Sequence, residues 1–370
     1  MADFKTLVNN ALVALNEVKI TTIGSNTGVQ EHAEDSILKA VLDINNEEKE
    51  WPYLISEQTK TVTPGIQRYA LPTTYRSIDW ESFFIRPSQL LSNSAFTSDI
   101  TTSWTAQHTG TGSAAYTSTG NGRARLAGGS SGIGALEQSV STIANIEYKI
   151  ILRTFTNTVK IRVGTSSGAT DILSDSSKAI TNAGGGAFHE QNFTATTGTT
   201  FIRIQNDANN NADVDLITVH ENISGRDLTY IDLDEWKRWF RTNEELLIPS
   251  SLLYPQRVFR THSDEFGLSG VPDKPYDVLY DAWVDPTVMS ANTDSPSIPA
   301  EWHTLIEERA LMYMYRFRSH LDEARAAESN YNKGIKNMRA KLIEYPKSMS
   351  DNRVPNQGRV TSSNVRTRSN

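Results

Sequence analysis

Apolar and polar residues alternate in the stretch Val159-Lys160-Ile161-Arg162-Val163, which is the pattern of a half-buried β-strand. Similar short runs recur at residues 148–152, 201–204 and 214–219, separated by Gly, Asn and Ser. Strands at intervals of about ten residues with such turns are typical of a sandwich or jelly roll. The middle of the chain is therefore predicted to be all-β.

The composition changes at the borders of this region. Residues 91–220 contain 17 charged residues in 130 and 14 of the 22 glycines, whereas the other 240 residues carry 62 charged residues. A linker would show a similar bias, but the strand-like alternation argues against one. Strand-like residues at 82–87 and 226–232 flank the region and could rejoin around it, so we predict a domain inserted at a hairpin tip.

The flanking segments have helical periodicity. Apolar residues recur at helical spacing over 4–18 and 37–44, and the longest such run, a hairpin or a broken helix, begins at Pro299 and reaches Leu342. Short strands are expected at 57–62, 68–71 and 80–85. The sequence thus predicts a multidomain chain with a mainly α-helical body and a small antiparallel sheet, plus an inserted all-β jelly-roll sandwich. The boundaries are 1–88 and 223–345 for the body, 89–222 for the insert and 346–370 for an extended tail.

Charge and cysteine content exclude several classes of function. The 36 Lys+Arg and 43 Asp+Glu give a net charge of −7, which lacks the basic excess of a nucleic-acid-binding chain. The absence of cysteine excludes disulfides and thiolate chemistry. No signal peptide and no run of 18 apolar residues occurs, so we expect synthesis in the cytoplasm and no membrane span.

The C-terminal tail differs from the rest of the chain in charge. Residues 346–370 hold five basic side chains and one acidic one, which leaves the body without insert and tail at −10. Such a segment does not fold alone and could become ordered against an acidic partner. A merely solubilising terminus remains the alternative.

No catalytic motif is complete. Gly128-Gly129-Ser130-Ser131-Gly132 matches G-x-S-x-G, but the strand before it and the helix after it are not evident. His303 and Glu307 have the i, i+4 spacing of two metal ligands without a third. We predict a protein that is not an enzyme and has no catalytic residue.

Several segments of the body resemble the head-to-tail adaptor (connector) proteins of tailed bacteriophages, called tail tubular protein A or head-completion proteins in short-tailed phages. The segments are 47–53 (EEKEWPY), 66–72 (IQRYALP), 75–78 (YRSI), 226–231 (RDLTYI), 278–283 (VLYDAW) and 297–303 (SIPAEWH).

The resemblance implies a virion protein of the viral neck or tail, made in the host cytoplasm. It implies a homo-oligomeric ring, usually a dodecamer of 12 copies, between the portal protein and the tail nozzle or tail tube protein. The ring would continue the DNA channel for genome packaging and DNA ejection, so that genomic DNA passes without specific binding. The tail would dock on the portal through Pro346, Lys347, Arg353, Arg359, Arg366 and Arg368.

The insert resembles jelly-roll carbohydrate-binding modules in its opening residues 91–104 and its closing residues 211–219. This resemblance implies a domain that projects outward from the ring. No cofactor is expected from the sequence itself; the resemblance adds Asn93 and Asp215 as candidates for a structural calcium ion, although two ligands are too few for a site. Trp104 and Tyr116 are its candidates for stacking on a host-surface glycan, while such a Trp is more often a core residue.

The alternative function is accordingly a carbohydrate-binding tail or decoration protein that contributes to host-surface adhesion. A glycan hydrolase would need two placed carboxylates, and the insert offers few. Its glutamates are Glu137, Glu147 and Glu190.

Overall fold

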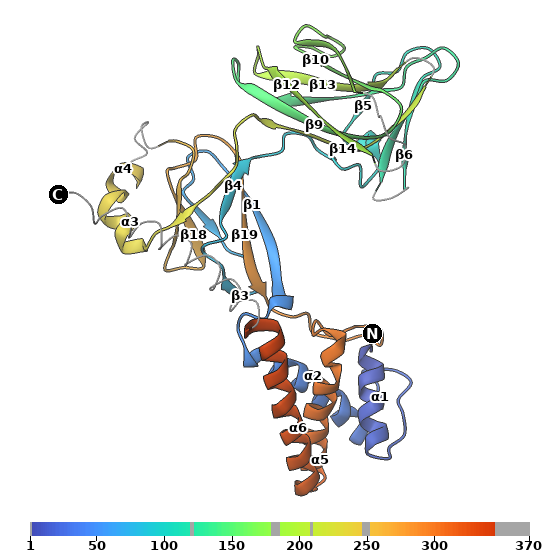
Figure 1. The fold of residues 1–370 in the computed structure, drawn as a ribbon, viewed down its shortest axis with the longest axis vertical. Coiled ribbons are helices and arrows are strands. Elements are labelled where there is room, and N and C mark those ends of the chain that lie inside the picture. The colour runs from blue at the N-terminus through green and yellow to red at the C-terminus, as the bar shows by residue number, and fades with distance from the viewer. Residues whose placement is uncertain (1, 119–121, 179–185, 208–209, 246–251, 345–370) are drawn as a thin grey trace, which may run out of the picture.

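The computed structural model describes residues 2–118, 122–178, 186–207, 210–245 and 252–344. Three units follow one another along the long axis of the molecule (Figure 1). A β-sandwich lies at one end, two smaller sheets lie in the middle, and a bundle of helices lies at the other end.

The helical unit consists of two segments that are distant in sequence. Its long helices bury one apolar stripe each against a shared core that includes Leu7, Ile37, Trp51 and Ile306. The predicted run from Pro299 is a hairpin, in which Ser319 takes a left-handed conformation (φ 61°) between the two helices. The helices are α1 (Phe4–Ala14), α2 (Val29–Glu47), α5 (His303–Phe317) and α6 (Leu321–Arg339), with short turns η1 (Pro52–Leu54), η4 (Ala300–Trp302) and η5 (Ala340–Glu344).

The middle unit holds two sheets with a common aromatic core around Phe83, Phe266 and Tyr280. The first has the order β1-β19-β4-β15, with β3 also on β19, and the second the order β16-β17-β18-β2. Helices α3 (Leu233–Trp239) and α4 (Arg241–Glu245) lie beside the second sheet. The strands are β1 (Ile55–Val62), β2 (Arg68–Ala70), β3 (Tyr75–Ile78), β4 (Phe84–Pro87), β15 (Arg226–Asp227), β16 (Thr229–Tyr230), β17 (Arg257–Arg260), β18 (Glu265–Ser269) and β19 (Tyr276–Val284).

The prediction of a mainly α-helical body with one small sheet was wrong. The body contains two sheets besides its helices, and among the described residues strand exceeds helix, 34% against 28%. The longest pairing joins β1 to β19, from Ile55 opposite Trp283 to Val62 opposite Tyr276. Its partners lie more than 200 residues apart, so local periodicity does not reveal it.

The sandwich lies between β4 and β15, which pair with each other where the chain leaves and re-enters the middle unit. Its sheets have the orders β11-β10-β13-β8-β5 and β12-β9-β14-β7-β6 and enclose one apolar core. The strands predicted at 148–152, 159–163, 201–204 and 214–219 lie within β9, β10, β13 and β14. The elements are η2 (Ile100–Thr102), β5 (Thr105–Ala106), β6 (Ser113–Thr117), β7 (Arg123–Ala127), β8 (Ala135–Ser141), β9 (Glu147–Thr156), β10 (Val159–Gly164), β11 (Leu173–Lys178), β12 (Ala187–Thr194), β13 (Thr199–Asn206) and β14 (Asn211–Glu221).

Within the described part of the chain, no helix has the length and apolar character that a bilayer span requires.

Candidate functional site

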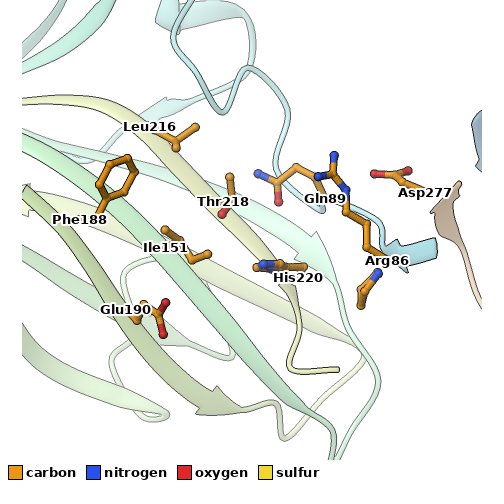
Figure 2. A pocket seen from close by; sticks show the side chains of 10 residues that line it. Arg86, Gln89, Ile151, Phe188, Glu190, Leu216, Thr218, His220 and Asp277 are labelled. Atoms are coloured by element: carbon orange, nitrogen blue, oxygen red, sulfur yellow. The ribbon is translucent and has the colours of Figure 1, made fainter. Parts of the chain in front are cut away.

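A cleft of about 500 Å³ lies where the sandwich meets the first middle sheet (Figure 2). Strands β9, β12 and β14 of the sandwich form one wall, and the ends of β4 and β19 form the other. The lining residues are Arg86, Pro87, Gln89, Ile151, Phe188, Glu190, Leu216, Thr218, His220 and Asp277.

Strand alternation presents these side chains to the cleft. Ile150 and Leu152 point into the sandwich core, so Ile151 between them points outward. The register then aligns outward residues of the three strands in two rows that cross the sheet. The rows are Glu190–Ile151–Thr218 and Phe188–Arg153–Leu216.

The outer end of the cleft carries an exposed aromatic ring. Phe188 is 63% exposed, and the guanidinium carbon of Arg153 lies 5.2 Å from its ring centroid. Arg153 also lies 4.8 Å from the ring centroid of Phe155 and forms a 3.2 Å salt bridge with Asp215. These contacts fix the Arg153 guanidinium beside the exposed Phe188 ring, so an aromatic and a cationic group lie together at this end of the cleft.

The inner end of the cleft is polar. The Nδ1 atom of His220 is buried and has no hydrogen-bond partner among the described residues. Burial lowers the pKa of His220, and the positive charges of Lys149 and Arg86 lower it further against the opposing effect of Asp277. The lowered pKa favours the neutral imidazole, in which one ring nitrogen donates and the other accepts a hydrogen bond.

The second wall is fixed by hydrogen bonds. The Oδ1 atom of Asp277 accepts hydrogen bonds from the hydroxyls of Thr61 (2.9 Å) and Ser88 (3.0 Å). The Oε1 atom of Gln89 accepts one from the backbone N–H of Val219 (2.7 Å). The segment after β4 is thereby tied to β14, so the cleft is bounded by positioned side chains.

The sequence-predicted aromatic residues do not line this cleft. Trp104 is only 3% exposed, packs against Phe96 at 5.6 Å between ring centroids and donates its indole N–H to the carbonyl oxygen of Asn93 (3.4 Å). It is a core residue with no face open to a sugar ring. Tyr116 is 37% exposed on β6, the strand at the opposite edge of the sheet from β12.

The candidate calcium ligands have other partners. Asn93 donates its side-chain amide to the carbonyl oxygens of Ser98 (3.2 Å) and Asp99 (3.3 Å). Burial raises the pKa of Asp215 against the opposing charge of Arg153, its salt-bridge partner. Each keeps one buried oxygen without a hydrogen-bond partner in the described structure, but no cluster of three His, Asp or Glu suited to a metal occurs there. The calcium site stays a prediction.

The remaining candidates have structural surroundings. His303 is buried, with Nε2 3.1 Å from the carbonyl oxygen of Ile298, and Glu307 accepts a hydrogen bond from Asn10 (2.7 Å). Gly128 and Gly132 close a turn between β7 and β8 through a 2.8 Å backbone hydrogen bond. The predicted portal-binding residues, which are Pro346, Lys347, Arg353, Arg359, Arg366 and Arg368, lie outside the described residues.

Sequence reasoning missed Phe188 and His220. The signal for Phe188 was the alternation in residues 187–194, where Phe188 and Phe193 stand an odd number of positions apart and so face opposite sides of a strand. His220 follows the predicted strand 214–219 directly, in phase with its outward residues.

The chain is elongated and consists of three successive units, and the cleft lies between two of them. The family model described as SU10 adaptor protein matches residues 151–359. The chain belongs to this family of phage structural adaptors, and it is a component of the virion. The matched stretch begins inside β9 and includes β10–β14, so part of the sandwich lies within the family pattern.

Solved structures similar to this chain match about a third of it. The enzymatically active domain of tailspike protein 4 of bacteriophage CBA120 is 11% identical over 36% of this chain and 21% of that chain, with a TM-score of 0.30. TmCBM61 in complex with beta-1,4-galactotriose is 16% identical over 36% and 99% (TM-score 0.28). The CBM22-1 xylan-binding domain of Paenibacillus barcinonensis Xyn10C is 16% identical over 37% and 97% (TM-score 0.28).

The chain thus spans about a fifth of the tailspike domain. At these TM-scores the likenesses carry no conclusion about ligand or function. No curated protein matches the sequence.

Proposed function

We propose that this protein is the head-to-tail adaptor of a short-tailed phage. Copies of the chain form a ring between the portal and the tail nozzle, the ring continues the DNA channel, and the basic tail docks on the portal. The observation that carries the proposal is the family match, which continues through the helical hairpin and into the tail as far as Arg359. The sandwich projects outward from the ring.

The helical unit has apolar side chains available for contacts between copies. Phe317 at the end of α5 is 59% exposed and lies 4.3 Å from His32 between ring centroids. Leu321 at the start of α6 is likewise exposed, as are Val13, Val18 and Leu42 elsewhere in the unit. A ring needs a heterologous contact of this kind, in which one face of a copy meets a different face of the next.

The charge distribution fits a DNA conduit. A body at −10 per copy repels the phosphate backbone, which favours passage over binding. The tail, with a net charge of +4, then binds an acidic protein partner. Because every copy in the ring carries one tail, many weak contacts add up to a high overall affinity.

The test is electron cryomicroscopy of the chain mixed with its portal. We expect a symmetric ring, twelvefold in the simplest case, on the narrow end of the portal. A chain ending at Glu344 should lose portal binding in co-sedimentation while its circular dichroism stays that of a folded protein. A matched control, Lys60→Gln, removes a positive charge from β1 and should bind as the full chain does. Unchanged portal binding by the truncated chain would refute docking through the tail.

A second function, adhesion to a host-surface glycan, is favoured by one observation, the exposed ring of Phe188 beside the polar end of the cleft. An apolar wall with a few placed polar groups is the general form of a small-ligand site. The cleft is also the place where a saccharide could contact the sandwich and the middle unit at once. This function adds to the adaptor role without replacing it.

The test is calorimetry with purified surface polysaccharide of the host. Phe188→Ala should weaken binding at least tenfold, because it removes the stacking surface without touching the core. The matched control is Tyr116→Ala, which removes an exposed aromatic ring outside the cleft and should leave the affinity unchanged. Loss of affinity with Tyr116→Ala alone would instead place the site at the residue nominated from the sequence. If the full chain does not bind the polysaccharide, this function is refuted.

A further inference from the structure

A second depression, the acidic groove, lies where the helical unit joins the middle sheets. It encloses about 690 Å³, and its apolar wall comes from Ile55, Ile78 and Trp283 together with Leu342 and Ile343 of η5. Four carboxylates, Glu48, Glu50, Asp79 and Glu81, surround this wall. No Lys or Arg is among the residues that line it.

Most of this negative charge is available to a ligand. Glu48 pairs with Arg339 at 2.8 Å. Glu50 accepts a hydrogen bond from the hydroxyl of Ser77 (3.4 Å), and Asp79 accepts one from the backbone N–H of Glu81 (3.0 Å). Neither of these donors carries a charge, so the rim keeps a negative potential that attracts a basic segment.

The wall also holds an unsatisfied donor. The indole Nε1 of Trp283 is buried and has no hydrogen-bond partner in the described structure. A buried donor without an acceptor costs free energy that an entering acceptor recovers. A peptide supplies such an acceptor in every backbone carbonyl group, which is a feature that a simple cation lacks.

The chain itself leads into this groove. The described residues end at Glu344, directly after Leu342 and Ile343 of the wall, and 26 residues follow. Those residues contain five basic side chains and one acidic one, with apolar side chains interspersed. Because the segment is tethered at the edge of the groove, its effective concentration there is high, on the order of millimolar for a short flexible connection.

We propose that the acidic groove binds the basic C-terminal segment, residues 345–370, of the same chain. The apolar side chains of the segment cover the wall, its Lys and Arg side chains pair with the uncompensated carboxylates, and a backbone carbonyl accepts from Trp283. The inference goes beyond the proposed function and does not depend on it. In a neck assembly the portal would compete with the groove for the segment.

The test uses the absence of cysteine from the chain. Ser350→Cys gives a single site for a nitroxide label in the full chain, and isoleucine methyl NMR reports its proximity to the wall. We expect strong broadening of Ile55 and Ile78, no effect on Ile204 in the sandwich core, and weaker broadening in 1 M salt, where screening reaches about 3 Å. Ile343 is too close in sequence to the label to be informative.

Charge reversal separates specific binding from mere tethering. Glu50→Lys and Glu81→Lys change exposed residues of the rim and should reduce the broadening of Ile55 and Ile78 at least twofold. The matched control Glu57→Lys makes the same change on β1 outside the groove and should leave it unaltered. Equal broadening in all three variants would overturn the proposal.

A mixture identifies the occupant. Isotope-labelled chains without nitroxide are combined with unlabelled chains that carry it. Broadening that appears in this mixture as strongly as in the singly labelled chain means that a second copy supplies the segment, which also overturns the proposal. Portal binding plays no part in these measurements, so the failure of either inference leaves the other standing.

Discussion

Glu244 is a buried carboxylate that joins three segments of the middle unit. Its Oε2 accepts hydrogen bonds from the side-chain amide of Gln67 (2.6 Å) and the indole N–H of Trp236 (2.6 Å). Its Oε1 accepts from the hydroxyl of Ser269 (2.9 Å) and the backbone N–H of Gly270 (2.8 Å). The residue is 6% exposed, so water cannot replace these four bonds.

The variant Glu244→Gln gives a calculable loss. A carboxamide has one acceptor oxygen, so two of the four donors lose their acceptor in either orientation of the amide. A hydrogen bond to a charged group contributes about 1.5–3 kcal/mol, and two lost bonds therefore reduce the free energy of unfolding by about 3–6 kcal/mol. A domain has about 5–15 kcal/mol in total, so this loss is a large share of the stability of the middle unit.

Hydrogen exchange in urea measures this loss locally, because three units in one chain need not unfold in a single transition. The amides of β18 and of Gly270 should lose protection, while those of the sandwich keep it. The control is Glu245→Gln, which removes the charge of the neighbouring, more exposed side chain and its 2.9 Å pair with Arg241. It should cost less than about 1 kcal/mol. An equally small effect of Glu244→Gln would refute the reasoning.

Three further changes have defined outcomes. Trp104→Ala should lower the stability of the sandwich by about 3–5 kcal/mol in thermal unfolding, because it empties a core site; a change below 1 kcal/mol would place the ring at the surface. Burial lowers the pKa values of His220 and His108 below 6.5, so the unfolded chain binds more protons than the folded chain. The stability that these residues contribute is complete above pH 6.5 and falls as the pH drops through their folded-state pKa values. His220→Gln should therefore flatten the fall in melting temperature between pH 7.5 and 5.5, and an unchanged slope would contradict this. Gly267→Ala would place a Cβ atom 2.1 Å from the ring of buried Phe259 and should cost about 1–3 kcal/mol, whereas unchanged urea unfolding would show that the ring moves freely.

Local patterns predicted the elements whose stability is local. The strand at Val159–Val163 and the apolar stripes of α1 and α2 follow directly from alternation and from helical spacing. The Gly, Asn and Ser turns separated the strands of the sandwich in the sequence as they do in the structure. These elements needed no information about distant parts of the chain.

The sheets of the middle unit could not be predicted in the same way. Strands β15 and β16 are two residues long, which is too short for any period, and they exist because Arg226 and Asp227 pair with β4 and Thr229 and Tyr230 pair with β17. The pairing of β1 with β19 depends equally on contacts across the whole insert. Register and long-range pairing are tertiary properties, so the sequence underestimated the share of strand.

The candidate site shows a similar limit. An aromatic residue in a strand predicts a ring on one face, but which face meets the core depends on the partner sheet. Trp104 turned inward onto Phe96, whereas Phe188 turned outward because Phe193, five positions on, occupies the core. Residue type alone does not separate an inward ring from an outward one, and only the register distinguishes the two.

Strand β19 connects the cleft and the acidic groove, the two proposed binding surfaces. Its first part contributes Asp277 to the cleft, and its last part contributes Trp283 to the acidic groove. The six residue steps from Asp277 to Trp283 correspond to about 20 Å of extended chain. The central position of β19, hydrogen-bonded to both β1 and β4, resists a change in that separation. A ligand bound in the cleft therefore cannot shift the groove by moving β19. We expect glycan binding and binding of the C-terminal segment to have independent free energies, so that neither ligand changes the affinity of the other.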